Sequence, residues 1–183
     1  GLANIAIEQL VCNNFGTEAW AAIKKKAGVN IESFSRMSPY PDEITFQLIG
    51  AAVEVLKIPP DDLMRTFGEF WAHYTPTQGY GYLFDMAGGS LIDFLYNLDN
   101  LHSRVGQNLP HLVPPSFRFD DLGNNRYRMH YHSERFGLCN IVVGVLKGLS
   151  DRFKTPLDVT HPTCQRNGAD HCEFELTVGE RNG

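Results

Sequence analysis

A proline-rich segment, Asn108 to Ser116, divides the sequence into two parts with different patterning. Proline has no backbone N–H group and disfavours a helical conformation in the residue before it, so we expect an extended connector here. Before the connector, apolar residues recur every three or four positions, as they do on one face of an α-helix. This spacing predicts helices at Leu2 to Asn14, Thr17 to Ala27, Asp42 to Leu56, Pro60 to Tyr74, Tyr80 to Ala87 and Ser90 to Gln107.

After the connector, alternating apolar and polar residues predict two β-hairpins separated by a long helix. The first hairpin turns at Gly123-Asn124-Asn125 and the second passes through Asn167-Gly168, and both are sequences that favour tight turns. The predicted strands are Phe117 to Asp120, Arg126 to His132, Leu157 to His161 and His171 to Val178, and the helix is Phe136 to Phe153.

The predicted fold class is therefore α+β in a single domain. Residues 1–60 form a mainly helical N-terminal subdomain, and residues 61–183 form a subdomain that combines an antiparallel sheet with helices. A chain of 183 residues with 43% hydrophobic residues is long enough to bury a substantial core.

Charge and apolar runs exclude several classes of protein. The formal net charge is -5, with 16 basic against 21 acidic residues, which argues against a nucleic-acid or anionic-membrane surface. No apolar stretch approaches the roughly 20 residues of a membrane-spanning helix, and the N-terminus lacks the pattern of a secretory signal. Four cysteines do not make a dense disulfide framework. We therefore expect a cytoplasmic protein.

The predicted helix SLIDFLYNLDNLHSRVGQ carries one histidine, His102, on the same face as Leu98, Leu101 and Val105. A polar ring among apolar neighbours costs free energy unless a partner satisfies it. The partner is either a backbone carbonyl or water, or a metal bound through one ring nitrogen. A second feature is needed to decide between them.

That second feature lies in RYRMHYHSERFG, which alternates like a strand and predicts that Tyr131, Ser133 and Arg135 project from one face. A phenol, a hydroxyl and a guanidinium suit an anionic ligand with two carboxylates, because arginine offers a bidentate fork and the hydroxyls donate single bonds. Haem propionates fit this description. The alternative is a solvated strand face on which the three residues are incidental.

Several motifs occur in an order that resembles the haem nitric oxide/oxygen binding (H-NOX) family, which includes the haem domain of soluble guanylate cyclase. They are GLANIAIEQL, FGTEAWAAIKKKAG, FGEFWAHYT, NLDNLHSRVG, VPPSFRF, YHSERFGL and IVVGVLKGL. The resemblance implies a haem b between the two subdomains, with His102 as the proximal iron ligand. It also implies that Tyr131, Ser133 and Arg135 clamp the propionates and that Pro115 presses on the porphyrin and distorts it.

The same resemblance implies that Trp71 and Ile141 line the distal side of the iron, with Asn140 as the alternative to Ile141. Family members that retain O2 have a distal tyrosine on the corresponding helix, and residues 136–149 contain none. Because O2 is held best by a hydrogen-bond donor and NO binds ferrous haem tightly without one, we expect NO and CO binding with poor O2 retention. The Trp71 indole is a possible donor, so an O2-binding haem sensor remains an alternative.

Cys139, His161, Cys164 and Cys172 supply the ligand set of a closed tetrahedral zinc site. The resemblance adds that some bacterial H-NOX proteins have such a cluster, in which thiolate oxidation is tied to redox sensing. The alternative is three separate buried thiols.

The expected function is a gas sensor without enzymatic activity, in which NO weakens the iron bond to His102 and moves its helix. By the resemblance, the signal would pass to a separate histidine kinase or cyclic-di-GMP enzyme. One rival is a haem peroxidase, which would need a distal acid–base histidine and arginine that the distal stripes do not offer. The other is an iron-free vinyl-reductase-like module that binds a small ligand, because NGADHCEFEL resembles the terminal hairpin of that class.

Overall fold

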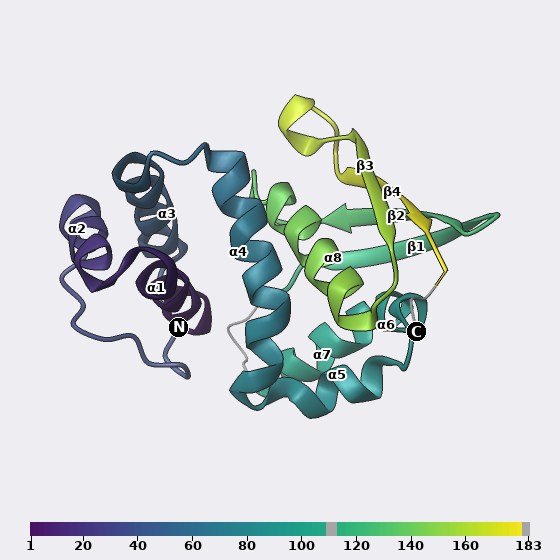
Figure 1. The fold of residues 1–183 in the computed structure, drawn as a ribbon, viewed down its shortest axis with the longest axis horizontal. Coiled ribbons are helices and arrows are strands. Elements are labelled where there is room, and N and C mark those ends of the chain that lie inside the picture. Colours follow the sequence, from purple (N-terminus) through teal and green to yellow (C-terminus); the bar gives the residue numbers. More distant parts are fainter. Residues whose placement is uncertain (109–112, 181–183) are drawn as a thin grey trace. The chain divides into compact units, whose positions relative to one another are not determined.

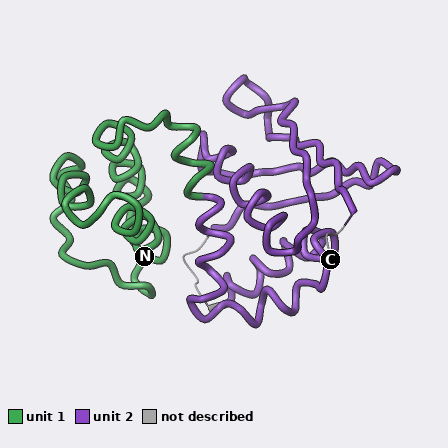
Figure 2. Tube along the Cα trace, viewed as in Figure 1, with its two compact units in different colours: residues 1–67 green, residues 68–183 purple. Residues whose placement is uncertain are grey.

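The computed structural model describes residues 1–108 and 113–180. Residues 109–112, in the middle of the predicted connector, therefore lie outside the described residues. Two compact units make up the chain, residues 1–67 and residues 68–183 (Figure 2). The division falls within helix α4 (Pro60–Thr75), whereas the sequence-based division was placed at residue 60. Among the described residues, no helix combines the length and the apolar character that crossing a membrane requires.

Unit 1 is helical, as predicted. It contains α1 (Leu2–Phe15), α2 (Thr17–Ala27), α3 (Asp42–Leu56) and the first turns of α4 (Figure 1). Its core gathers the apolar stripes of these helices, including the buried residues Val11, Trp20, Ile23, Leu48 and Leu63.

The helices of unit 2 are the rest of α4, α5 (Gly81–Ala87), α6 (Leu91–Tyr96), α7 (Leu98–Asn108) and α8 (Cys139–Phe153). A π-helical turn, Pro76–Tyr80, joins α4 to α5. The prediction of one helix from Ser90 to Gln107 was wrong, because the chain leaves helical geometry at Asn97. The Asn97 side chain donates to the carbonyl oxygens of Ala87 and Asp93, each at 3.0 Å, and so competes with the helical ladder.

Four antiparallel strands form one sheet in the order β1-β2-β4-β3. Their bounds are β1 (Ser116–Gly123), β2 (Arg126–His132), β3 (Leu157–Thr163) and β4 (Cys172–Val178). Both predicted hairpins are present. The first turns through Asn124 and Asn125 at φ values of 53° and 57°, the left-handed geometry that asparagine tolerates and that matches the strand twist.

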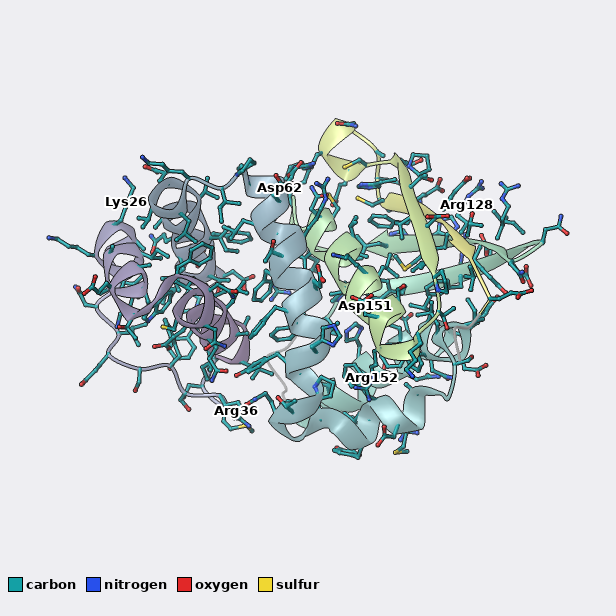
Figure 3. The ribbon with its side chains drawn as sticks, in the orientation of Figure 1. Lys26, Arg36, Asp62, Arg128, Asp151 and Arg152 are labelled. Atoms are coloured by element: carbon teal, nitrogen blue, oxygen red, sulfur yellow. The ribbon has the colours of Figure 1, made fainter. Side chains whose placement is uncertain are left out.

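The two faces of the sheet differ in polarity. The inner face carries Met129, Tyr131 and Phe174, which are at most 5% exposed and share one core with residues of α8. The outer face carries charged pairs between neighbouring strands, such as Arg128 with Glu175 at 2.8 Å (Figure 3). This alternation follows from the period of two in a β-strand.

In unit 2, the end of α4 packs closely on α8. An ideal Cβ atom on Gly68 would lie 2.1 Å from the backbone oxygen of Ile141, and one on Gly148 would lie 2.7 Å from the Cβ of Ala72. Because these helices carry Trp71 and Ile141, the close approach sets the spacing of the predicted distal residues.

Gly68→Ala is therefore expected to destabilise the protein. Alanine favours a helix over glycine by about 1 kcal/mol, but the added methyl group meets backbone atoms that cannot rotate away, and overpacking costs about 1–3 kcal/mol. Because the 2.1 Å approach to backbone places the cost at the upper end of this range, we expect a net loss of about 2 kcal/mol in the free energy of unfolding, measured by urea denaturation. The matched control is Gly50→Ala in α3, where nothing lies within 4 Å and a small gain is expected. Equal or greater stability of the Gly68→Ala protein would contradict the close packing.

Candidate functional site

His102 lies on α7 and is largely withdrawn from solvent. Burial lowers the pKa of its imidazole, which outweighs the opposing effect of the nearby Asp99 carboxylate. The ring is therefore neutral near pH 7, which is the form that binds metals. Its buried Nδ1 has no hydrogen-bond partner among the described residues. Buried polar atoms in proteins almost always have a partner, so this nitrogen calls for a bound ligand or a water molecule.

A chain of aromatic rings joins His102 to the predicted clamp. The imidazole stacks on Phe117 of β1 at 5.6 Å between ring centroids, and Phe117 contacts Tyr131 of β2 at 5.4 Å. Phe117 and Tyr131 are also register partners across the two strands. The carboxylate of Asp99, one helical turn before His102, accepts a hydrogen bond from the Phe117 backbone N–H at 2.6 Å. α7 is thus fixed to the edge of the sheet.

The sequence analysis missed Phe117 and Asp99 as site residues. The spacing of Asp99 from His102 places both within one turn of the same helix. No signal in the sequence indicated that the partner of this turn is the first strand after the connector.

Tyr131, Ser133 and Arg135 are brought together, although not by one continuous strand. β2 ends at His132, whose register partner Ser116 is the first residue of β1, so no strand remains to pair with Ser133. The Ser133 hydroxyl accepts a hydrogen bond from the Arg135 backbone N–H at 3.1 Å. Burial raises the pKa of the Tyr131 phenol, and a hydrogen bond with Ser133 and the Arg135 charge oppose that rise.

Arg135 also reaches the predicted connector. Its Nη1 donates to the backbone oxygen of Val113 at 2.7 Å, two residues before Pro115. The segment that contains Pro115 is therefore attached to the same turn that carries Ser133 and Arg135. Pro115 itself is half-buried and precedes β1 directly.

The two predicted distal residues come from the helices that meet at Gly68. Trp71 lies one turn after Gly68 on α4, and Ile141 supplies the backbone oxygen that Gly68 approaches. Both side chains are half-buried. Asn140, the alternative to Ile141, is 4% exposed.

Cys139, His161, Cys164 and Cys172 form one cluster, in which the four ligand atoms all lie within 4.8 Å of one another. The Sγ atoms of Cys139 and Cys164 are 3.8 Å apart. Two thiolates at about 2.3 Å from a tetrahedral zinc ion would be separated by about 3.8 Å. Burial and the neighbouring thiol of Cys164 raise the pKa of Cys139 to about 12.

His161 has the arrangement of a metal-binding histidine. Its ring stacks on Phe174 at 4.2 Å and has a backbone hydrogen bond with Thr163, while its buried Nε2 has no partner among the described residues. The Cys172 sulfur accepts the Gln165 backbone N–H at 3.3 Å. Such outer hydrogen bonds orient the ligands of zinc sites. The donor set and its partnerless nitrogen fit a zinc ion.

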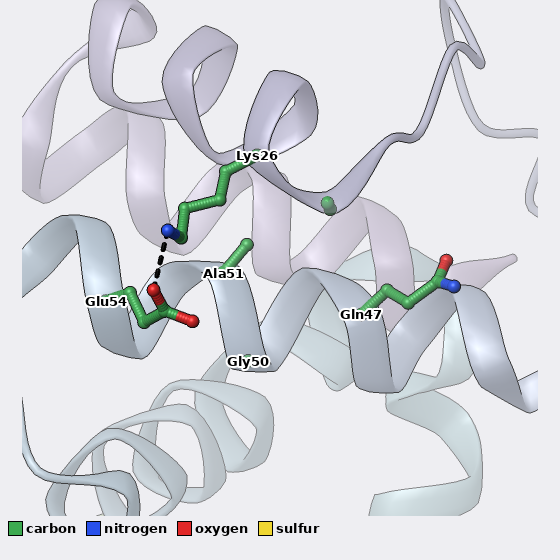
Figure 4. A pocket seen from close by; sticks show the side chains of 6 residues that line it. Lys26, Gln47, Gly50, Ala51 and Glu54 are labelled. Carbon is green, nitrogen blue, oxygen red and sulfur yellow. Dashed lines mark ion pairs between the residues drawn. The ribbon is translucent and has the colours of Figure 1, made fainter.

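A surface pocket in unit 1 contains none of these residues. It is open to solvent and lined by Lys26, Gln47, Glu54 and their neighbours on α2 and α3 (Figure 4). The Lys26 ammonium and the Glu54 carboxylate pair across it at 2.6 Å. Because both side chains are largely exposed, this pair contributes little to stability.

Comparison with solved structures shows what kind of protein this fold defines. The chain is similar to an H-NOX protein from S. oneidensis in the Fe(II)NO ligation state, with a TM-score of 0.90, 22% identity and coverage of 98% of this chain and 99% of the other. It is also similar to the Fe(II) unliganded H-NOX protein from K. algicida, with a TM-score of 0.84, 19% identity and coverage of 98% and 96%. The fold is thus that of the H-NOX proteins.

Sequence comparison gives the family. The haem-NO-binding family matches residues 1–161. The chain is 31% identical to soluble guanylate cyclase gcy-32 of Caenorhabditis elegans over 163 residues, 87% of this chain and 24% of that protein. It is 33% identical to guanylate cyclase soluble subunit beta-2 of Rattus norvegicus over 91 residues, 50% of this chain and 13% of that protein. The chain thus spans about a quarter or less of these relatives.

The chain belongs to the haem-NO-binding (H-NOX) family. H-NOX domains bind haem and serve as gas sensors. The predicted family and its general role as a haem-binding gas sensor are therefore confirmed.

Proposed function

We propose that this chain is a haem sensor for NO and CO in which His102 holds the iron of haem b. The observation that carries the proposal is the neutral imidazole of His102 with its partnerless buried nitrogen, joined through Phe117 to Tyr131. When bound, haem supplies an iron atom with one open position for a diatomic gas.

The other predicted site residues would hold the haem in the pocket. Tyr131, Ser133 and Arg135 would donate hydrogen bonds to the two propionates, and the guanidinium would supply the charge that those carboxylates need. Pro115 would contact the porphyrin from a segment that the Arg135–Val113 hydrogen bond holds in place. A haem peroxidase is a poorer fit, because Trp71 and Ile141 offer no acid–base pair on the distal side.

Gas selectivity follows from the distal side chains. Ile141 has no hydrogen-bond donor, and residues 136–149 contain no tyrosine that would supply one. A donor contributes about 1 kcal/mol to holding a polar ligand. We expect the reduced protein to bind CO and NO, and to show in air no lasting spectral change other than oxidation.

Absorption spectra of the reduced protein under nitrogen, CO, NO and air test this selectivity. The variant Ile141→Tyr adds a hydroxyl, and we expect it to slow the loss of O2 about fivefold relative to the matched variant Ile141→Phe, since about 1 kcal/mol corresponds to that factor. A parent protein that holds O2 for hours in air would refute the selectivity. It would favour the second candidate, an O2 sensor, for which the Trp71 indole N–H and the buried amide of Asn140 are the two donors to test.

Signal output in this proposal runs through α7. With haem bound, a change in the bond to His102 would act on a helix that is attached to β1 by the Asp99–Phe117 hydrogen bond and the stacked rings of His102 and Phe117. A ligand shifts a conformational equilibrium only through such a state-dependent contact. The proposed receiver is a separate cytoplasmic histidine kinase or cyclic-di-GMP enzyme, and the sensor itself catalyses no reaction.

We also propose that the cysteine cluster holds a structural zinc ion. Its support is the mutual spacing of the four ligand atoms and the partnerless Nε2 of His161. Zinc would stabilise the thiolates of Cys139, Cys164 and Cys172, which burial otherwise keeps protonated at Cys139 and Cys172. Oxidation of these thiolates would release the ion and give the protein a second, redox-dependent response.

A further inference from the structure

The outer face of the sheet carries a second cluster of metal-binding side chains, separate from the cysteine cluster. His130 lies on β2, and Glu173 is its register partner on β4. His171 lies two residues before Glu173, so the period of two brings it to the same face. One ligand atom from each of these three residues lies within 4.8 Å of the others. The residue between them, Cys172, points to the opposite face, where it belongs to the cysteine cluster.

The spacing of the three atoms is that of a coordination sphere. His130 Nδ1 lies 3.0 Å from His171 Nε2 and 3.3 Å from Glu173 Oε1, and His171 Nε2 lies 3.5 Å from the same oxygen. Ligands at about 2.1 Å from one metal ion lie roughly 3.0–3.4 Å apart at octahedral or tetrahedral angles. The cluster therefore already has the separations that a bound ion requires.

The hydrogen bonds around the cluster assign the protons. His130 Nε2 lies 2.8 Å from the Asp120 carboxylate, and His171 Nδ1 lies 2.6 Å from the Asp170 carboxylate. An aspartate carboxylate is ionised near pH 7 and then only accepts hydrogen bonds. The hydrogens in these two contacts therefore come from His130 Nε2 and His171 Nδ1, which leaves His130 Nδ1 and His171 Nε2 without a hydrogen.

Among the described residues, Arg118 is the donor that competes at this position. Its Nη2 lies 3.0 Å from His130 Nε2 and 3.4 Å from the Asp120 carboxylate. The contact between Nε2 and the carboxylate is shorter, and two acceptors at 2.8 Å would repel each other, so Nε2 keeps its hydrogen and Arg118 pairs with Asp120. Its side chain is 68% exposed and is free to turn away.

As a result, three acceptor atoms face one another: two imidazole lone pairs and a carboxylate oxygen. The other carboxylate oxygen of Glu173 accepts the Thr163 hydroxyl at 3.0 Å, which fixes its orientation. His171 is held from the far side by stacking on His132 at 4.4 Å. Converging acceptors without a hydrogen between them are unfavourable unless a cation lies among them.

We propose that His130, His171 and Glu173 form a second metal site that binds a divalent first-row transition metal of the zinc class. Two histidines and one carboxylate, each histidine backed by an aspartate, are a donor set for such ions, and water completes the coordination. The side chains of His171 and Glu173 are 18% and 23% exposed, so an ion reaches the site from solvent. The site depends neither on haem nor on the cysteine cluster.

Calorimetric titration of the reduced protein with zinc tests the proposal. The protein is first loaded with one equivalent of zinc to fill the cysteine cluster, and a further single equivalent is expected to bind. Glu173→Gln and His171→Asn are each expected to weaken this second step more than 100-fold. Asp170→Asn, which removes only an outer hydrogen bond, is expected to weaken it about 10–100-fold. The matched control is His73→Asn, which removes an exposed imidazole on α4 that does not contact the cluster and is expected to leave the step unchanged.

A cobalt(II) spectrum identifies the ligands. In the Cys139→Ser/Cys164→Ser protein, cobalt is expected to bind at one equivalent with the weak bands of nitrogen and oxygen ligands and without thiolate charge transfer. Circular dichroism of each metal-free variant establishes that it is folded. Absence of a second zinc step in the parent would overturn the proposal. Persistence of the step in the Glu173→Gln/His171→Asn double variant would overturn it as well.

Discussion

The Cys139→Ser protein is expected to lose the zinc of the cysteine cluster while retaining haem. The cluster offers four ligand atoms, and a closed zinc site requires all four. A serine hydroxyl remains protonated and is a poor substitute for a thiolate. Zinc binding to structural sites amounts to about 10–16 kcal/mol, so losing one of four ligands costs several kcal/mol, or at least about 100-fold in affinity.

Elemental analysis of zinc and iron after treatment with a weak chelator measures this effect, in proteins that also carry Glu173→Gln and His171→Asn so that the second metal site cannot retain zinc. The matched control is Cys12→Ser, because Cys12 lies on α1 in unit 1 and takes no part in the cluster. The parent and the control are expected to keep zinc, and Cys139→Ser only iron. A reduced parent protein without zinc, or a Cys139→Ser protein with a full equivalent, would contradict the zinc site.

The sequence predicted the helices of unit 1 and both hairpins because their signals are local. Apolar spacing sets the helices, and the Asn124-Asn125 pair accepts the left-handed turn that a two-residue hairpin needs. The break at Asn97 was not predictable in this way. It depends on a hydrogen bond from the Asn97 side chain to the Ala87 carbonyl, ten residues away, which apolar spacing does not report.

The candidate site shows the same limit. His102 and the Tyr131, Ser133 and Arg135 triplet were predicted, since their chemistry is unusual for their positions. Their connection was not predicted, because Phe117 is an ordinary apolar strand residue until the sheet register places it between His102 and Tyr131.

The outer-face cluster was also missed for a physical reason. His130, His171 and Glu173 come from segments far apart in the sequence, and only the pairing of β2 with β4 brings them together. By contrast, the cysteine cluster was noticed because cysteine is rare in this chain, with four residues in total.

His102→Gly is expected to have the largest effect on the haem. Glycine removes the imidazole that burial keeps neutral, and no other described histidine lies on the apolar face of α7. The cavity that remains suits free imidazole, which has the same ligand chemistry. We therefore expect the variant to lose haem or its axial coordination, and added imidazole to restore the parent spectrum.

The matched control for this change is His73→Gly, because His73 is an exposed histidine on α4. Glycine within a helix costs about 1 kcal/mol in either variant, so the two proteins carry a similar helical penalty. His73→Gly is expected to keep the parent spectrum, which separates loss of the ligand from loss of helix stability.

The absorption spectrum of the reduced His102→Gly protein, recorded with and without imidazole, tests whether this imidazole holds the iron. We expect an altered or absent Soret band that imidazole returns to the position and intensity of the parent band. The same pigment with the same axial coordination in the absence of imidazole would contradict it.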